Sequence, residues 1–311
     1  MNVGSVQSTS MKHTRRDFIQ TTSLAASSLL LGAGSAFASP ADAAKPAFSA
    51  ADKVALGRSG LKATRLMLGT GMRGWHRQSN HTRMGLEKFT ALVRGAHERG
   101  LRFFDLADLY GTHDFFVQAM KGVPRADYAL TTKIWWNKGG LPETERPDAD
   151  LVVGRFLKEL KTDYLDLVLL HCVTSGKWPE ELAKQMELLA GLKKKGVIKA
   201  HGVSCHSLPA LQAAAKESWV DSIHARINPF GAVMDGKPEE ILEVLREARR
   251  NGKGVVGMKI VGEGRFRNEA DKKKESVRFA LQSGCVDVLL VGCENLTELD
   301  EIRDLMAAVK T

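Results

Sequence analysis

Gly69-Thr70-Gly71-Met72-Arg73-Gly74 follows the first strand-like run of the chain, and the residues after it decide the fold. The glycine spacing fits the G-x-G-x-x-G turn that binds a dinucleotide in an open, doubly wound α/β sheet. In that fold a helix begins at the turn itself. Here a loop with Trp75 and His76 intervenes, and helical spacing begins only near Met84. The glycines are therefore weak evidence for the open sheet, which stays as the alternative to a closed barrel.

Strand-like apolar runs alternate with segments of helical spacing along the rest of the chain, and the alternation counts to eight. Continuous apolar runs such as residues 165–170 are typical of strands buried on both faces, as in parallel sheets. Glycines that follow several helical segments, such as Gly100 and Gly252, are expected C-caps. Eight units in roughly 270 residues favour one domain, a (β/α)8 TIM barrel of the α/β class.

These runs also give the expected boundaries of the elements. Strands are expected at Arg65–Thr70, Phe103–Ala107, Tyr128–Trp135, Leu165–Cys172, Ala200–Cys205, Ser222–Ile227, Val255–Ile260 and Val286–Val291. Helices are expected at Leu86–Arg99, His113–Lys121, Asp148–Leu160, Glu180–Lys195, Leu208–Glu217, Glu239–Asn251, Lys272–Ser283 and Leu296–Val309.

The N-terminal stretch has the features of an export signal. Thr14–Ile19 carries the Arg15-Arg16 pair of a twin-arginine pattern, and a weakly apolar run to Ala38 follows it. That run is too short and too rich in Ser, Gly and Ala for a stable membrane span. We expect a twin-arginine signal peptide at 1–38, a flexible tether at 39–52 and the barrel at 53–311. The twin-arginine translocase is then a partner and the periplasm the destination; the alternative is a disordered basic N-terminus in a cytosolic protein.

The charge and the cysteines narrow the choice of partners. The net charge of +9 is spread along the chain, and its lysine runs, such as 272–274, have no interleaved aromatic residues. We therefore expect no nucleic-acid partner. The four cysteines form no C-x-x-C pair, so no metal site is expected, and buried free thiols are favoured over disulfides. A monomer or weak oligomer is expected.

Four polar side chains fall at the ends of three consecutive expected strands. Asp105 and Tyr110 close the second strand, Lys133 lies near the end of the third, and His171 ends the fourth. Active sites of such barrels lie at the C-terminal ends of the strands, so these four side chains are expected to converge. Each alone has a plain explanation as a cap, a solvated cation or a packed ring.

Together the four side chains match the needs of carbonyl reduction. Hydride arriving at the carbonyl carbon builds negative charge on its oxygen, and a phenol such as that of Tyr110 can donate the proton. A buried ammonium beside the phenol is expected to lower its pKa, and the ammonium itself needs a carboxylate in a dry pocket. An imidazole on the other side would hold the carbonyl oxygen. Lys133, Asp105 and His171 fill these roles.

The segment Phe104-Asp105-x-Ala107-x-x-Tyr110-Gly111 resembles the D-x-A-x-x-Y-G signature of the aldo-keto reductases. Thr132-Lys133, Leu169-Leu170-His171 and Gly202-Val203-Ser204 follow in the order of that family, over residues 53 to 309. The resemblance implies a (β/α)8 barrel that binds NADPH without a Rossmann domain. It also implies that Asp105, Tyr110, Lys133 and His171 are the catalytic residues.

Cofactor contacts are carried over position by position, with departures. The family grips the nicotinamide amide with a Ser-Asn pair and a Gln, where this chain has Ser204, Cys205 and His224. Cys205 is as readily a packed small side chain as a ligand. The other expected cofactor contacts are Gly69, Thr70 and Gly71 after the first strand, and Lys259, Gly262, Gly264, Arg265, Arg267 and Asn295 after the last two.

The eighth unit departs most from the family. Glu298 falls at or near the position where the resemblance implies an Arg that clamps the 2′-phosphate of NADPH, and an acid there would repel that phosphate. Arg267 is the expected substitute, and NADH stays possible. Trp75, Trp135, Trp136 and Trp178 lie just past strand ends, so the mouth of the pocket is expected to be aromatic unless some of them only seal the barrel.

The leading hypothesis is therefore an NAD(P)H-dependent oxidoreductase that reduces aldehydes or ketones to alcohols, with Tyr110 as proton donor. The alternative is a nucleotide-binding barrel with a sensing or interaction role and residual reductase activity. A third class, a barrel isomerase or hydrolase of phosphorylated sugars, would not need the four residues together.

Overall fold

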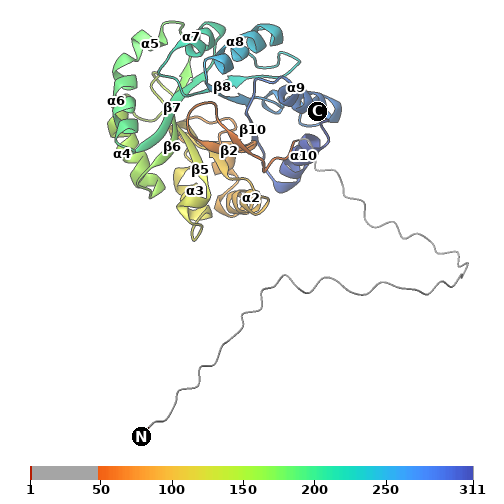
Figure 1. Cartoon of the computed structure of the whole chain (residues 1–311), viewed down its shortest axis with the longest axis horizontal. Coiled ribbons are helices and arrows are strands. Elements are labelled where there is room, and N and C mark those ends of the chain that lie inside the picture. Colours follow the sequence, from red (N-terminus) through yellow and green to blue (C-terminus); the bar gives the residue numbers. More distant parts are fainter. Residues whose placement is uncertain (2–47, 311) are drawn as a thin grey trace, which may run out of the picture. The chain divides into compact units, whose positions relative to one another are not determined.

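A computed structural model describes residue 1 and residues 48–310 of the chain. Residues 2–38 of the expected signal peptide and residues 39–47 of the expected tether lie outside the described residues. Eight parallel strands form a closed barrel in the order β10-β3-β4-β5-β6-β7-β8-β9, with helices around it (Figure 1). The expected (β/α)8 barrel is therefore confirmed, and the open sheet is excluded because β10 pairs with β3 and closes the ring.

The elements of the barrel follow one another in strand–helix units. The barrel strands are β3 (Leu66–Gly69), β4 (Phe103–Asp105), β5 (Ala129–Ile134), β6 (Leu165–Val173), β7 (Ile198–Cys205), β8 (Ser222–Arg226), β9 (Gly254–Met258) and β10 (Val288–Gly292). The helices are α1 (Asn80–Arg83), α2 (Leu86–Glu98), α3 (His113–Ala119), α4 (Ala149–Leu160), α5 (Trp178–Glu181), α6 (Ala183–Lys194), α7 (Leu208–Lys216), α8 (Pro238–Arg250), α9 (Ala270–Gln282) and α10 (Leu296–Ala307). Three single 3-10 turns are η1 (Asp108–Tyr110), η2 (Arg125–Asp127) and η3 (Gly262–Gly264).

Alternation along the strands divides the interior into two apolar layers. Successive strand side chains point to opposite faces, so one set fills the barrel and the other packs under the helices. Met67, Phe103, Leu167 and Val256 belong to the cluster inside the barrel. Residues one position away, such as Phe104, lie in the larger cluster between strands and helices. Polar side chains at inward positions are exceptions to this apolar filling, and they are therefore candidates for a functional site.

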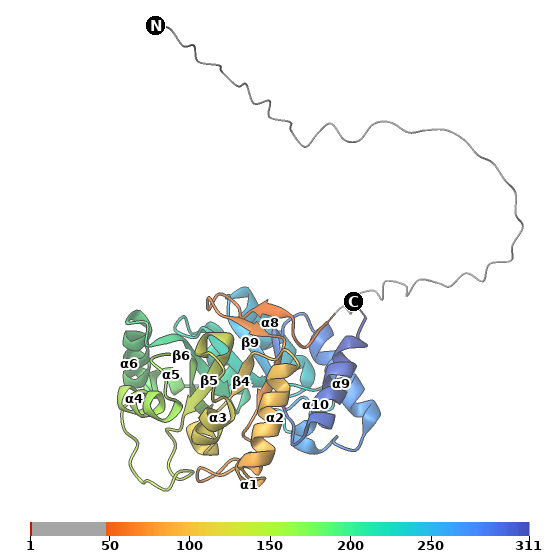
Figure 2. The same ribbon diagram turned by 90° about the horizontal axis from the view of Figure 1, so that it is seen from below.

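An N-terminal hairpin that the sequence did not predict covers one end of the barrel. β1 (Lys53–Ala55) and β2 (Lys62–Thr64) pair antiparallel, and the turn between them places Leu56 in the cluster inside the barrel. Gly57 has a φ of +54° there, and a Cβ on it would lie 2.2 Å from the backbone nitrogen of Gly254. Only glycine allows this close approach. Figure 2 shows the hairpin near one end of the barrel and α1 near the other.

The helices differ from the expectation in two places. The helix expected at Glu180–Lys195 is two helices, α5 and α6, which meet at Leu182. Pro179 stands in the first turn of α5, where its missing N–H costs nothing, and so that helix begins earlier than expected. The short α1 was not expected as a helix; Ser79 caps it by accepting a bond from the Thr82 backbone N–H.

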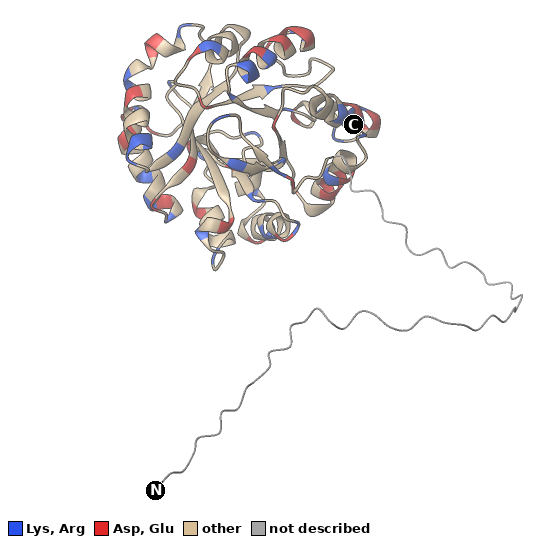
Figure 3. Ribbon diagram, viewed as in Figure 1, with Lys and Arg blue, Asp and Glu red and all other residues tan. Residues whose placement is uncertain are grey.

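Other features of the described residues bear on partners. All four cysteines are free, and three of them are buried, as expected. Within residues 48–310, no helix has the length and apolar character to cross a membrane. The same part of the chain holds no cluster of three side chains suited to a metal ion. Acidic and basic residues are interspersed along the outer helices (Figure 3).

Candidate active site

The four expected catalytic side chains converge at one end of the barrel. Lys133 Nζ on β5 donates to Asp105 Oδ1 at the end of β4, at 2.5 Å, and to the Leu106 carbonyl at 3.0 Å. The same ammonium lies 3.3 Å from the Tyr110 hydroxyl, which lies 3.4 Å from Nε2 of His171 on β6. Parallel strands bring their C-terminal ends to the same rim, which is why three consecutive strands can supply one cluster.

Tyr110 is the one member of this cluster that does not lie on a strand. It ends η1, the single turn between β4 and α3, and Gly111 follows it with a φ of +68°. Its ring lies against the backbone of the β3–α1 loop: a Cβ on Gly71 would be 2.2 Å from the ring, and one on Gly74 would be 2.5 Å away. Gly71 and Gly74, two glycines of the G-x-G-x-x-G spacing, therefore make room for the phenol.

Burial dominates the charges of the Lys133–Asp105 pair. It raises the pKa of Asp105, and the attraction of Lys133 offsets only part of that effect. It also lowers the pKa of Lys133, against the attraction of Asp105. A buried ion pair of this kind stabilises the fold little by itself, and its value lies in the fixed position of the ammonium beside the phenol.

The expected lowering of the Tyr110 pKa is wrong in direction. Burial raises the pKa of Tyr110 well above its ordinary value, and the carboxylate of Asp105 adds to the effect. The phenol is therefore protonated throughout the neutral range. A protonated phenol is the form that a proton donor needs before it acts.

His171 is a neutral imidazole in this setting. Burial lowers its pKa well below the ordinary value, and the positive charge of Lys133 adds to that. Its ring meets that of Trp135 edge to face at 5.4 Å, while its backbone carbonyl accepts a bond from the indole of Trp136 at 2.8 Å. Trp75 is half exposed and packs on Trp135, whereas Trp178 is fully buried under α7. Trp135 and Trp136 therefore contact His171, Trp75 packs on Trp135, and Trp178 only seals the helix layer.

A cavity of about 600 Å³ opens beside Tyr110 and Asp105 and runs to the loops after β9 and β10. The expected cofactor residues that line it are Gly69, Gly71, Lys259, Gly264, Arg265 and Arg267. The inward positions Met258 and Leu290 form part of its wall and were not expected, although strand alternation alone would have identified them.

Charged side chains meet at the end of the cavity that α9, α10 and the loops before these helices form. Arg267 Nη1 lies 2.7 Å from Glu294 Oε2, and its other terminal nitrogen pairs with Glu298. Lys273 pairs with Glu301 on α10. The sequence predicts Arg267 and Glu298 here but not Glu294, Lys273 and Glu301, because only the folded loops together with α9 and α10 bring these side chains to one cavity.

The remaining expected cofactor residues lie outside the lining of this cavity. Thr70 donates to the Asp105 carbonyl at 2.8 Å, and Ser204 accepts a bond from the Cys172 backbone at 2.9 Å. Cys205 points away from the barrel interior into the layer under the helices. Gly262 lies in η3, and Asn295 caps α10 by accepting from the Glu298 backbone at 2.9 Å.

His224 lies inside the barrel beneath the catalytic cluster. Its side chain is fully buried, its Nδ1 lies 3.9 Å from Asp105 Oδ1, and neither ring nitrogen has a hydrogen-bond partner. Burial lowers its pKa well below the ordinary value, so the ring is neutral. An unpaired buried imidazole is costly, and His224 does not line the cavity beside Tyr110.

Comparison with known proteins adds independent findings. The family model described as "Aldo/keto reductase family" matches residues 65–310. Methylglyoxal reductase DkgB of Salmonella typhimurium is 32% identical over 138 residues, which is 43% of this chain and 48% of that protein. Methylglyoxal reductase DkgA of Escherichia coli O157:H7 is 26% identical over 219 residues, 64% of this chain and 73% of that one.

The fold is also similar to that of a solved aldo-keto reductase structure. The holo form of aldo-keto reductase AKR11C1 from Bacillus halodurans superposes with a TM-score of 0.67 at 21% identity, over 84% of this chain and 92% of that one. The chain spans about half the length of the DkgB relative that it matches. The match of the family model, over about four fifths of the chain, all eight barrel strands and all four expected catalytic residues, shows that this chain belongs to the aldo/keto reductase family.

Proposed function

We propose that this chain is an NAD(P)H-dependent carbonyl reductase that converts aldehydes or ketones to alcohols, with Tyr110 as the proton donor. One observation carries the proposal. The Tyr110 hydroxyl lies within 3.4 Å of both Lys133 Nζ and His171 Nε2, beside a cavity of about 600 Å³. The volume falls in the range of cavities that hold small ligands and cofactors.

The described residues fit a nicotinamide nucleotide. Gly69, Gly71 and Gly292 line the cavity, and a Cβ on Gly292 would lie 2.7 Å from the Met72 side chain, so bare backbone keeps the space open. When bound, the nucleotide supplies the hydride.

The residues of the chain then handle the proton and the carbonyl oxygen. Neutral His171 and the Tyr110 hydroxyl hold the carbonyl oxygen between them and favour the charge that develops on it. Tyr110 transfers its proton to that oxygen, and the ammonium of Lys133 stabilises the phenolate left behind. Asp105 keeps Lys133 charged and fixed during the step.

NADPH is the hydride donor that the family resemblance implies, and NADH stays within the proposal. Arg267, the expected partner of a 2′-phosphate, already binds Glu294 and Glu298. A 2′-phosphate would have to displace one of these carboxylates from Arg267. The free ribose hydroxyl of NADH would instead donate a hydrogen bond to such a carboxylate. The difference in free energy between these two sets of contacts decides the preference for NADPH or NADH.

Small aldehydes and ketones are the proposed substrates. The relatives named methylglyoxal reductases make methylglyoxal a sensible member of a test panel. The rings of Trp75 and Trp135 border the site, so aromatic aldehydes belong to the panel as well.

The proposal is tested by titrating the purified protein with NADPH and with NADH while nicotinamide fluorescence is followed, and then by assaying an aldehyde panel. The proposal predicts binding of at least one nucleotide and aldehyde-dependent oxidation of it. Failure to bind either nucleotide would refute the proposal. Binding without turnover, unchanged in Tyr110→Phe, would favour a sensing role instead.

We further propose that the chain is exported to the periplasm by the twin-arginine translocase. Arg15 and Arg16, the weakly apolar run and the small residues Ala36 and Ala38 support this destination. That route carries folded proteins, so a nucleotide bound before export would travel with the chain. A variant with Arg15→Lys and Arg16→Lys should stay in the cytoplasm; its arrival in the periplasm would refute the route.

A further inference from the structure

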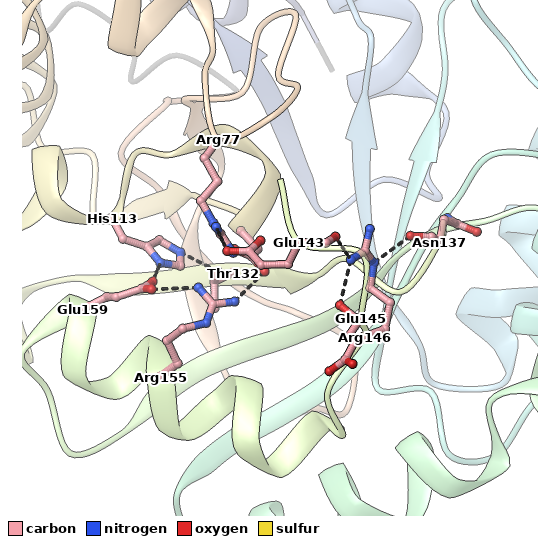
Figure 4. A network of polar contacts seen from close by, with 10 residues as sticks. Arg77, His113, Thr132, Asn137, Glu143, Glu145, Arg146, Arg155 and Glu159 are labelled. Atoms are coloured by element: carbon pink, nitrogen blue, oxygen red, sulfur yellow. Dashed lines mark hydrogen bonds and ion pairs between the residues drawn. The ribbon is translucent and has the colours of Figure 1, made fainter. Parts of the chain in front are cut away.

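An unbroken chain of polar contacts runs from Thr132 through His113, Glu159 and Arg155 to the neighbourhood of Arg77 (Figure 4). It begins at Thr132, the neighbour of Lys133, whose hydroxyl lies 2.9 Å from His113 Nε2. His113 Nδ1 lies 2.6 Å from one oxygen of Glu159, and the other oxygen accepts from Arg155 at 2.7 Å. The contacts therefore tie β5, α3 and α4 together just outside the barrel.

The chain of contacts continues into the turn that carries Tyr110. Asp108 stands two residues before the tyrosine, and its carboxylate is only 3% exposed. Arg155 Nη2 binds its Oδ2 at 2.6 Å, and Arg77 Nε binds its Oδ1 at 3.0 Å. Two arginines from different segments thus hold one buried carboxylate from both sides, so the turn has little freedom to move.

Arg77 also belongs to the loop that lies over the tyrosine ring. Its Nη1 binds Glu143 Oε1 at 2.5 Å, and a Cβ on Gly111 would lie 1.8 Å from its carbonyl oxygen. The same loop places Gly71 and Gly74 against the ring of Tyr110. One arginine therefore connects the turn below the phenol with the backbone above it.

This loop holds an unfavourable backbone conformation. Arg73, His76 and Arg77 have φ values of 50°, 53° and 54°, in the left-handed region that residues with side chains seldom adopt. Such a conformation persists only where surrounding contacts impose it. The ion pairs of Arg77 with Asp108 and Glu143 are contacts of this kind, and without them the loop would relax away from the phenol.

We propose that Asp108, with Arg77 and Arg155, is a positioning device that sets the Tyr110 hydroxyl between Lys133 and His171. Asp108 is a positioning residue, since it neither lines the cavity beside Tyr110 nor contacts the reacting atoms. The inference rests on the proposed reductase function only for its kinetic readout. Its structural readout is independent of any substrate.

The structural test uses the small number of tyrosines. The chain has three, Tyr110, Tyr128 and Tyr164, so incorporation of 3-fluorotyrosine gives three fluorine resonances that Tyr→Phe variants assign. Arg77→Met and Arg155→Met should move or broaden the Tyr110 resonance and leave the other two in place. Unchanged Tyr110 resonances in both variants would overturn the proposal, whether or not the protein reduces any carbonyl compound.

The kinetic test asks whether the arginines act through the tyrosine. Since displacement of a catalytic group by about 1 Å costs up to ~100-fold in rate, Arg155→Met should lower kcat by roughly 10- to 100-fold. In a Tyr110→Phe background the same substitution should change the residual single-turnover rate less than about twofold, because the group being positioned is gone. Equal losses in both backgrounds would overturn the proposal.

Matched controls separate positioning from general stability. Arg99 forms a two-contact pair with Asp300 on α10, with an exposure close to that of Arg77 (28% against 30%). Arg99→Met should leave kcat and the Tyr110 resonance as in the wild type; because Asp300 is 36% exposed against 3% for Asp108, urea unfolding of each variant is measured alongside. Arg155→Lys, which keeps one charge contact with Asp108, should recover part of kcat. Asp108→Asn serves as the third variant if either arginine variant fails to fold.

Discussion

Lys133 Nζ lies 3.3 Å from the Tyr110 hydroxyl and 4.7 Å from the centre of its ring. The ammonium thus contacts the phenol at its polar end while it stays bound to the carboxylate of Asp105. Such an ammonium has little effect while the phenol is protonated and its largest effect when the proton leaves, because only the phenolate carries charge. The arrangement is therefore matched to the transition state of proton donation rather than to the resting protein.

Removing one member of the buried ion pair should destabilise the fold more than removing both. Lys133→Met leaves the Asp105 carboxylate buried without a partner, and we expect a loss of about 3–5 kcal/mol in the free energy of unfolding. The double variant Lys133→Met/Asp105→Asn carries no charge at either position and should lose less than Lys133→Met alone. Urea unfolding of the wild type and the two variants measures this; a double variant that loses as much stability as Lys133→Met, or more, would contradict it.

The rate of carbonyl reduction should be independent of pH through the neutral range. Burial raises the pKa of Tyr110 and lowers that of His171, so the phenol keeps its proton and the imidazole stays neutral from about pH 6 to pH 9. The reverse reaction, alcohol oxidation, needs the phenolate and should accelerate as the pH rises. Single-turnover rates in both directions test this, and an inflection near pH 6.5 in the reduction rate would be incompatible with a neutral His171.

Stability should fall as the solution becomes acidic. His171, His201 and His224 are buried, and burial lowers their pKa values, that of His201 to about 4. The unfolded chain takes up protons at these residues below about pH 6.5 while the folded chain does not, so stability is present above that pH and is lost as the pH falls. Each residue contributes up to ~1.4 kcal/mol per pH unit.

Urea unfolding at pH 7, 6 and 5 checks the size and the sign of this effect. His201 stacks on Trp219 at 4.1 Å, away from the catalytic cluster. His201→Gln should therefore flatten the dependence on pH without changing kcat. Equal stability at pH 7 and pH 5 in the wild type would show that the buried histidines do not resist protonation.

The preference between NADPH and NADH should depend on the acids that hold Arg267. Glu298→Gln removes one of its two carboxylate partners and one negative charge beside the proposed position of the 2′-phosphate. Because these groups are partly exposed, we expect a modest gain of roughly 2- to 10-fold in NADPH affinity. NADH affinity should change less, and equal changes for the two nucleotides in a fluorescence titration would place the 2′-phosphate elsewhere.

The barrel and the catalytic cluster were predictable because they depend on local patterns. Runs such as residues 165–170 are buried on both faces and identify parallel strands, and side chains at the ends of neighbouring strands must meet at the rim. The positions of Asp105, Lys133 and His171 follow from this rule alone. The N-terminal hairpin did not follow, since its strands have only three residues each and owe their order to the packing of Leu56 in the barrel.

The charged end of the cavity and the pKa of Tyr110 depend on packing that the sequence does not show. Glu294, Lys273 and Arg267 come from two loops and a helix, and their pairing depends on how those segments close over the cavity. The phenol was expected to have a lowered pKa because Lys133 is near it, but the burial of Tyr110 has the larger effect. A sequence motif predicts that Lys133 lies beside Tyr110, but it does not predict how deeply the phenol is buried.

Single-turnover hydride transfer in the wild type and in Tyr110→Phe is the most direct test of the central claim. The protein is loaded with the nucleotide that binds more tightly, mixed with an aldehyde that the wild type reduces, and followed by nicotinamide absorbance. Loss of the proton donor should slow the step by about 10²- to 10⁴-fold, with the Kd of the nucleotide unchanged. A rate in Tyr110→Phe within about twofold of the wild type would contradict the assignment of Tyr110 as proton donor.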